Sequence, residues 1–129
     1  MQNRLRLAGI QAAAEAAHVT VSVQTAPTWD IGSGFYAART LLSAPGLPTA
    51  LICIHERLAV GVRLAAADLG FAVPADLSIV SFDDGELLAS RLLPPLTTIE
   101  RPDRAMAEEA VTVTLQRLDE EGGAPIPVG

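Results

Sequence analysis

The first quarter of the chain changes from a helical to a strand-like spacing of apolar residues. Apolar or small residues recur at steps of three and four, which predicts an amphipathic helix; they are Leu5, Ala8 or Gly9, Ala12, Ala13 and Ala16. Residues 18–25 then alternate valine with threonine, serine and glutamine. This period of two predicts a half-buried strand at or near the edge of a sheet.

Three further helices are predicted from caps and apolar stripes. Asp30 is a suitable N-cap for a helix that runs to about Ser43, because its carboxylate can accept hydrogen bonds from the unpaired amides of the first turn. An apolar stripe over residues 58–69 predicts a second helix, and Gly70 stands where a glycine commonly ends one. A last helix is expected over residues 103–121.

Short apolar runs between the helices predict covered strands. Residues 49–54 and 77–82 are almost continuously apolar, as strands buried on both faces of a parallel sheet are. After Pro94-Pro95, residues 96–100 form a further extended segment. Helices and strands therefore alternate, which predicts an α/β fold with a parallel sheet. The pattern opens on a helix that no strand precedes.

The distribution of charge does not fit a nucleic-acid-binding surface. The formal net charge is −6, and the nine basic residues are all arginines scattered from Arg4 to Arg117. Displacing counterions from phosphates requires clustered basic residues, and the acidic run at residues 119–121 would repel a polyanion. We therefore expect that this chain does not bind DNA directly.

The single cysteine and the length of the apolar runs exclude further classes. Cys53 alone rules out an intramolecular disulfide and a multi-cysteine metal site, and its apolar surroundings predict a buried thiol. Each apolar run falls far short of the ~20 residues that a membrane helix needs. Gln11 and Glu15 interrupt an Ala-rich stretch that otherwise resembles a signal peptide. We expect a cytoplasmic protein with no membrane partner.

Polar residues follow three of the predicted strands. They are Trp29-Asp30 beyond the first strand, His55-Glu56-Arg57 beyond the second and Asp83-Asp84 beyond the third. Because ligands of open parallel sheets bind beyond the carboxyl ends of strands, we expect these groups to converge on one crevice. Each group alone is also what an ordinary solvated loop contains.

The sequence offers little support for catalysis. His18 and His55 are far apart, and no Cys or His stands at the spacing of metal ligands, so neither a metal nor another cofactor is expected. Adjacent residues such as Asp83 and Asp84 leave a strand in opposite directions, which argues against a shared acid–base role. The stretch Gly32-Ser33-Gly34 is too short for a phosphate-binding loop. We predict that the protein is not an enzyme.

Several motifs resemble the effector-binding core of lactose/galactose-repressor-type (LacI/GalR) transcription regulators. The most specific are VPADLSIVSFDD at residues 73–84 and PPLTTI at residues 94–99, and the resemblance covers nearly the whole chain in order. Shorter matches lie at Arg4–Gly9, Ser33–Phe35, Pro48–Ala50 and Leu58–Gly61.

The resemblance implies a two-lobed fold of the periplasmic-binding-protein type, three-layered (α/β/α), with a sugar-like effector between the lobes. Residues 1–100 would form most of the C-terminal lobe without its first strand, residues 101–121 a helix that packs on the other lobe, and residues 122–129 a loose tail. DNA would be bound only through a headpiece that these residues do not contain.

The resemblance also implies ligand contacts. Arg6 matches an effector-contacting arginine and Asp83 an acceptor for sugar hydroxyls, while Trp29 stands where an aromatic ring can stack on a sugar. Arg101 replaces a common glutamine, and His55 replaces a usual asparagine while keeping one donor and one acceptor. Without the resemblance, Arg6 would be read as a solvated helix arginine, and Trp29 could equally be a core anchor.

The helix carrying Val60 and the segment near Leu92 would form a homodimer interface by the same resemblance. One alternative is a sugar-binding protein of a transport system, which shares the fold but should carry an export signal. Another is a truncated remnant, because a sheet without its opening strand exposes an unpaired edge. We therefore expect the isolated chain to be poorly stable or oligomeric.

Overall fold

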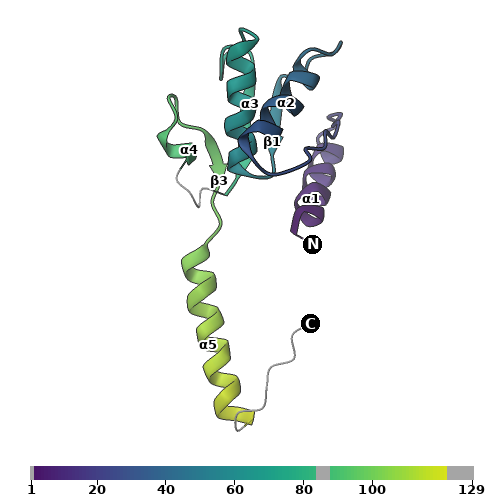
Figure 1. Cartoon of the computed structure of the whole chain (residues 1–129). Coiled ribbons are helices and arrows are strands. Elements are labelled where there is room, and N and C mark those ends of the chain that lie inside the picture. The colour runs from purple at the N-terminus through teal and green to yellow at the C-terminus, as the bar shows by residue number, and fades with distance from the viewer. Residues whose placement is uncertain (1, 84–87, 122–129) are drawn as a thin grey trace.

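The computed structural model describes residues 2–83 and 88–121, in which helices and strands alternate from α2 onward. Asp84 and the expected tail at residues 122–129 lie outside the described residues. The elements follow in the order α1 (Gln2–Ala16), α2 (Ile31–Leu42), β1 (Ala50–Cys53), α3 (Glu56–Asp68), β2 (Ser78–Phe82), α4 (Leu88–Arg91), β3 (Thr97–Ile99) and α5 (Asp103–Glu121) (Figure 1).

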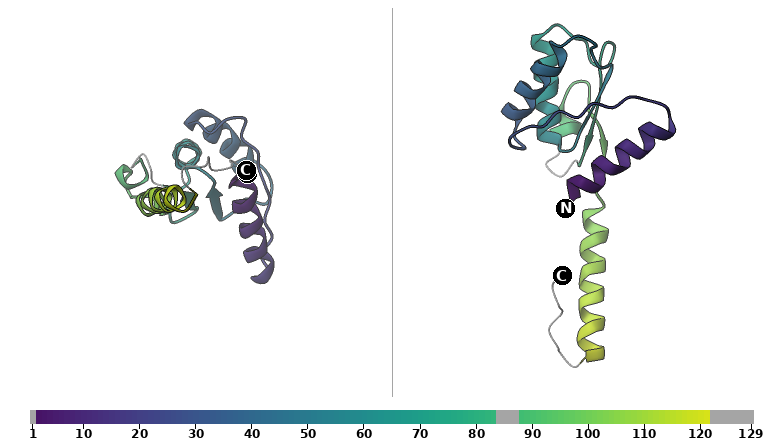
Figure 2. Two further views of the ribbon diagram at one scale, coloured as in Figure 1. Left: turned by 90° about the horizontal axis from the view of Figure 1, so that it is seen from below. Right: turned by 90° about the vertical axis from the view of Figure 1, so that its right-hand side faces the viewer.

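A parallel sheet with the strand order β1-β2-β3 forms the centre of the molecule. Cys53 pairs with Ser81 across β1 and β2, and Phe82 pairs with Ile99 across β2 and β3. Helices α2 and α3 cover one face of this sheet (Figure 2). The α/β class with a parallel sheet is therefore confirmed.

The opposite face of the sheet is only partly covered. Ile52 of β1 and Ile99 of β3 lie on this face and are 50% and 49% exposed. Val80 and Phe82 of the central strand are half-buried there. Of the three expected layers, the sheet and one helical layer are packed within the described residues, and the second helical layer is not.

Helices α2 and α3 pack backbone against backbone through two glycines. A Cβ atom added to Gly34 would lie 2.4 Å from the carbonyl oxygen of Leu58. A Cβ atom added to Gly61 would lie 2.1 Å from the carbonyl oxygen of Ile31. Only residues without a side chain allow this close approach, which buries Ala59, Ala65 and Ala66 completely.

The predicted helix caps are confirmed. The Asp30 carboxylate accepts the backbone N–H of Ser33 at 2.7 Å and caps α2. Gly70, just beyond α3, has a φ angle of +82°, which is typical of a left-handed C′ glycine. The start of α3 differs from the prediction, because His55 is its N-cap and the helix begins at Glu56.

The strand predicted at residues 18–25 is wrong. Residues 19–26 have no regular structure, and Val19, Val21 and Val23 are 60%, 40% and 57% exposed. A strand exists only when a neighbouring strand pairs with its backbone amides and carbonyls, and none of β1, β2 or β3 does so here. The alternating valines therefore have neither a pairing partner nor a sheet face to bury.

Helix α5 extends away from the sheet and its covering helices (Figure 1). Its apolar side chains at Met106, Val111, Leu115 and Leu118 are 54%, 59%, 56% and 45% exposed. The apolar stripe that predicted this helix is thus not buried against the rest of the described chain.

Cys53 is buried at the end of β1, as predicted from its apolar neighbours. Burial raises the pKa of its thiol to about 12, so the thiol stays protonated near neutral pH. No helix within residues 2–83 and 88–121 is long and apolar enough to cross a membrane.

Candidate functional site

The carboxyl ends of the three strands meet at one edge of the sheet. His55 follows β1, Asp83 follows β2 and Arg101 follows β3, and the parallel register places these segments next to one another. Arg6 reaches the same edge from α1, and Trp29 reaches it from the segment before α2. We call these five residues the carboxyl-edge site.

Arg6 and Asp83 form the best-defined contact of the site. Nη2 of Arg6 donates to both carboxylate oxygens of Asp83 at 2.9 Å, and Nη1 donates to the carbonyl oxygen of Ile54 at 2.8 Å. The guanidinium also lies 4.8 Å from the centre of the Phe82 ring. The two side chains are only 13% and 14% exposed, so Arg6 is not a solvated helix arginine.

The backbone of Asp83 is held in an uncommon conformation. Its φ angle is +65°, in the left-handed region that residues other than glycine rarely adopt and that aspartate tolerates better than most. Its backbone N–H donates to the carbonyl oxygen of Ile99 at 3.0 Å. The hydrogen bond that the Asp83 backbone donates to β3 and those that its carboxylate accepts from Arg6 thus hold this residue at the strand end, and such local strain is frequent at functional sites.

Arg101 lies near the carboxylate of Asp83 but donates its hydrogen bonds to the carboxylate of Asp103. Its Nη1 lies 3.7 Å from Oδ2 of Asp83, whereas its Nε and Nη2 donate to the carboxylate of Asp103, the latter at 3.0 Å. The hydrogen bonds to Asp103 raise the pKa of Arg101, and the same contact lowers the pKa of Asp103. Asp83 therefore lies between two arginines.

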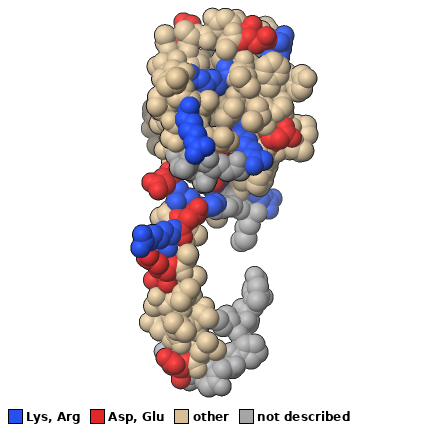
Figure 3. Space-filling model, turned by 60° about the vertical axis from the view of Figure 1, so that its left-hand side comes forward, with Lys and Arg blue, Asp and Glu red and all other residues tan. Residues whose placement is uncertain are grey.

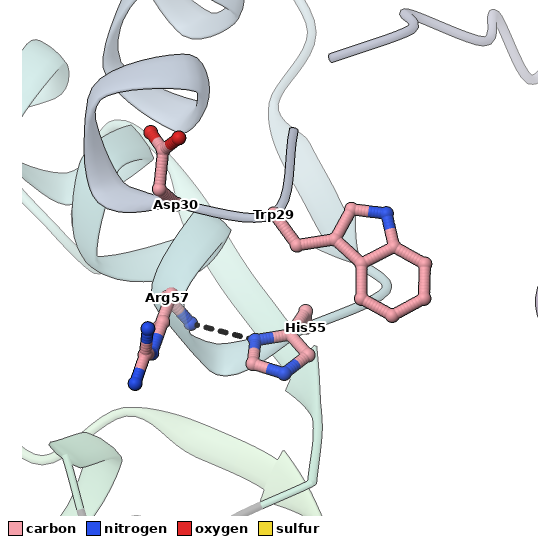
Figure 4. Close-up of a pocket in the computed structure, with 4 residues that line it drawn as sticks. All are labelled: Trp29, Asp30, His55 and Arg57. Carbon is pink, nitrogen blue, oxygen red and sulfur yellow. Dashed lines mark hydrogen bonds between the residues drawn. The ribbon is translucent and has the colours of Figure 1, made fainter. Parts of the chain in front are cut away.

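A shallow pocket of about 400 Å³ opens beside this ion pair, lined by Trp29, Asp30, His55 and Arg57 (Figure 4). The rings of Trp29 and His55 have centroids 5.9 Å apart and are tilted by 31°. Trp29 is 54% exposed, so the alternative of a core anchor is wrong. Ile54, which accepts from Arg6, directly precedes His55 and joins the pocket to the ion pair.

Asp30 and Arg57 line the pocket although neither was predicted to contact a ligand. Asp30 has a structural task, because the Thr28 hydroxyl and the Ser33 amide donate to its carboxylate and lower its pKa. Arg57 was visible in the sequence only as part of a polar run after a strand. Phe82, which contacts the Arg6 guanidinium, was read only as a buried strand residue.

Neither metal binding nor a polyanion surface is supported in the described part of the chain. No group of three or more His, Cys, Asp or Glu side chains is placed there to hold a metal ion. Basic and acidic side chains are interspersed on the face shown in Figure 3. The arrangement at the carboxyl edge offers hydrogen-bond donors and acceptors beside an exposed aromatic ring, which suits a small polar ligand.

Comparison with known proteins extends over nearly the whole chain. A family model described as a periplasmic binding protein-like domain matches residues 1–128. The chain is 37% identical over 117 residues to the ribose operon repressor of Escherichia coli (strain K12), covering 89% of this chain and 35% of the repressor. It is 34% identical over 122 residues to the HTH-type transcriptional repressor PurR of Haemophilus influenzae (strain PittEE), covering 89% and 34%.

Solved structures give the same result. The lac repressor bound to ONPG in the repressed state superposes with a TM-score of 0.83 at 31% identity, covering 92% of this chain and 36% of the repressor. A lac repressor dimer bound to operator and the anti-inducer ONPF superposes with a TM-score of 0.81 at 31% identity, covering 94% and 36%. The chain spans about a third of the length of the curated relatives it matches.

Proposed function

The chain belongs to the periplasmic binding protein-like family, and from this premise we propose that it is the effector-sensing part of a bacterial transcription regulator. The predicted resemblance to lactose/galactose-repressor-type regulators is confirmed by relatives that are named repressors. The observation that carries the proposal is the convergence of Arg6, Asp83 and the Trp29–His55 pocket at the carboxyl edge of the sheet.

The proposed effector is a small polyhydroxy molecule such as a sugar. The Arg6–Asp83 pair sets a donor beside an acceptor, which suits vicinal hydroxyls. The exposed Trp29 ring suits the apolar face of a sugar, and Arg101 adds a further donor next to Asp83.

In this proposal, residues 1–100 form a lobe and residues 101–121 pack on a second lobe. The effector acts by favouring one arrangement of lobes over another, which changes the affinity for DNA at a separate headpiece. We assign no catalytic step to this chain, and we place the regulator in the cytoplasm, where its DNA is.

The effector site is tested by isothermal titration with D-ribose, D-galactose and D-glucose. Arg6→Ala and Asp83→Ala are each expected to weaken binding of the responsive sugar by about tenfold to a hundredfold, because a hydrogen bond to a charged group contributes roughly 1.5–3 kcal/mol. Arg39→Ala, which removes an exposed ion pair with Asp68, is the control and should bind normally. Unchanged affinity in both site variants would remove these assignments.

We further propose that α3 and the segment that follows α4 form a homodimer surface around Val60 and Leu92. Leu64, one turn beyond Val60, is 51% exposed, and Leu93 is 88% exposed. Arg63 joins the two parts of this surface by donating to the carbonyl oxygens of Leu93 and Pro94, the latter at 2.8 Å. Exposed leucines on one continuous surface are typical of interaction sites.

Leu64→Glu is expected to raise the dimer dissociation constant by about tenfold or more, because a charge would be placed in an apolar contact. Analytical ultracentrifugation over a concentration series measures this constant. Leu47→Glu is a matched control, since Leu47 is 47% exposed and belongs to the loop between α2 and β1, outside the proposed surface. Equal self-association of the two variants would contradict the proposed surface.

A further inference from the structure

His55 is bound to the backbone of the helix that it starts. Its φ and ψ angles of −154° and 143° are those of an N-cap, and its Nδ1 accepts the backbone N–H of Arg57 at 3.3 Å. A neutral imidazole carries one N–H and one bare nitrogen. Because Nδ1 accepts, the proton of neutral His55 must be on Nε2. The helix cap therefore selects one tautomer.

The other ring nitrogen is available to a ligand. Figure 4 shows Nε2 on the side of the ring away from the capped amide, in a pocket wall shared with Trp29. No residue within 2–83 or 88–121 accepts a hydrogen bond from it.

We infer that His55 is a specificity-determining residue that presents one hydrogen-bond donor and no acceptor to the ligand. The inference rests on the proposed function of the same site and narrows the ligand class. The ligand atom beside Nε2 must be a hydrogen-bond acceptor, such as a hydroxyl, carbonyl or carboxylate oxygen or an unprotonated ring nitrogen. A protonated amine at that position is rejected, because two donors would face each other.

The same reasoning explains which substitutions preserve the site. An asparagine here can cap α3 with its oxygen and turn its NH₂ group to the ligand, which reproduces both roles of His55. An aspartate can cap the helix equally well but presents only acceptors. His55→Asn and His55→Asp therefore form a matched pair. Both keep the helix cap, but the first presents a hydrogen-bond donor to the ligand and the second presents only acceptors.

The tautomer is measured directly by ¹⁵N–¹H correlation spectra of the imidazole rings in the full chain near pH 8. The chain has two histidines, and His18→Asn assigns the signals, since asparagine tolerates the φ of +56° at position 18. A proton on Nε2 with a bare Nδ1 is expected for His55. A proton on Nδ1 would overturn the inference without any reference to a ligand.

Titration with D-ribose, D-galactose and D-glucose then tests the specificity role. His55→Asn should bind the responsive sugar within about threefold of the unmodified protein, and His55→Asp should lose about tenfold or more, with thermal unfolding midpoints preserved in both. Equal binding by the two variants would overturn the inference. If the unmodified protein binds none of these sugars, the proposed function fails, whereas the tautomer is still decided by the spectra.

Discussion

Gly61→Ala is expected to cause the largest loss of stability of any glycine-to-alanine change within the part of the chain that the structure describes. The new Cβ would lie 2.1 Å from the carbonyl oxygen of Ile31 and 2.6 Å from the backbone nitrogen of Phe35. These are backbone atoms of α2, which cannot rotate aside as a side chain can. The helices must separate, and the fully buried Ala59 and Ala65 then lose contacts with their neighbours.

Overpacking of a core typically costs about 1–3 kcal/mol, and a backbone clash lies at or beyond the upper end of this range. Because about 1 kcal/mol shifts the midpoint of a small domain by roughly 4–8 °C, the unfolding midpoint should fall by roughly 10 °C or more. Thermal unfolding followed by circular dichroism at 222 nm measures the shift.

Gly9→Ala is the matched control for this experiment. Gly9 is also helical, and a Cβ atom added there would meet nothing within 4 Å. Alanine favours the helix over glycine by roughly 0.5–1 kcal/mol, so this variant should be as stable as the unmodified chain or slightly more so. If Gly61→Ala unfolds at the same temperature as Gly9→Ala, the close packing of α2 on α3 is not as described.

Breaking the Arg6–Asp83 pair is expected to have the second largest effect, because it links α1 to the sheet across 77 positions of sequence. Removing one partner from a largely buried ion pair leaves the other charge poorly solvated, and we expect a cost of roughly 2–3 kcal/mol. The two single variants should differ. Without the Asp83 charge, Arg6 and Arg101 repel each other, whereas without Arg6 the Asp83 carboxylate still has Arg101 at 3.7 Å.

A double-mutant cycle of Arg6→Ala and Asp83→Asn measures the coupling. Asparagine removes the charge and tolerates the φ of +65°, so backbone strain does not enter the comparison. Asp83→Asn should cost more than Arg6→Ala, the double variant should cost less than the sum, and native-state hydrogen exchange should show faster exchange throughout α1 in all three.

Arg104→Ala provides the reference for an ordinary surface pair. Arg104 and Glu108 are 92% and 64% exposed on α5, and such pairs contribute only about 0.5 kcal/mol or less. Additive costs for Arg6→Ala and Asp83→Asn would show that the contact contributes no more than this surface pair does.

The sequence predicted the elements whose formation depends on neighbouring residues. Asp30 caps α2 and Gly70 follows α3 because the capping group and the capped backbone are a few positions apart. The apolar runs at β1 and β2 correctly predicted strands of a parallel sheet, but the expectation that both faces are covered is wrong for the described residues, since Ile52 is 50% exposed. The motifs at residues 73–84 and 94–99 predicted the family, which the comparisons confirm.

Residues 18–25 show where this local reasoning fails. Their alternating valines have the period of a strand, but pairing requires hydrogen bonds from a second strand, which no local pattern can supply. In the same way, the apolar stripe of α5 predicted a helix but could not show which surface the stripe packs against. In the structure α5 extends away from the sheet and its apolar side chains are exposed.

By itself, the sequence determined the caps, the order of the elements from α2 through α3 to β2, and the residues that end β1 and β2, because these depend on contacts within a few positions. Only the tertiary structure decided that Arg6 contacts Asp83, that Trp29 stays exposed beside His55, and that the cap of α3 selects the tautomer of His55. These features depend on the register of three strands and on the close packing of α2 on α3. Both are set by contacts between segments tens of residues apart.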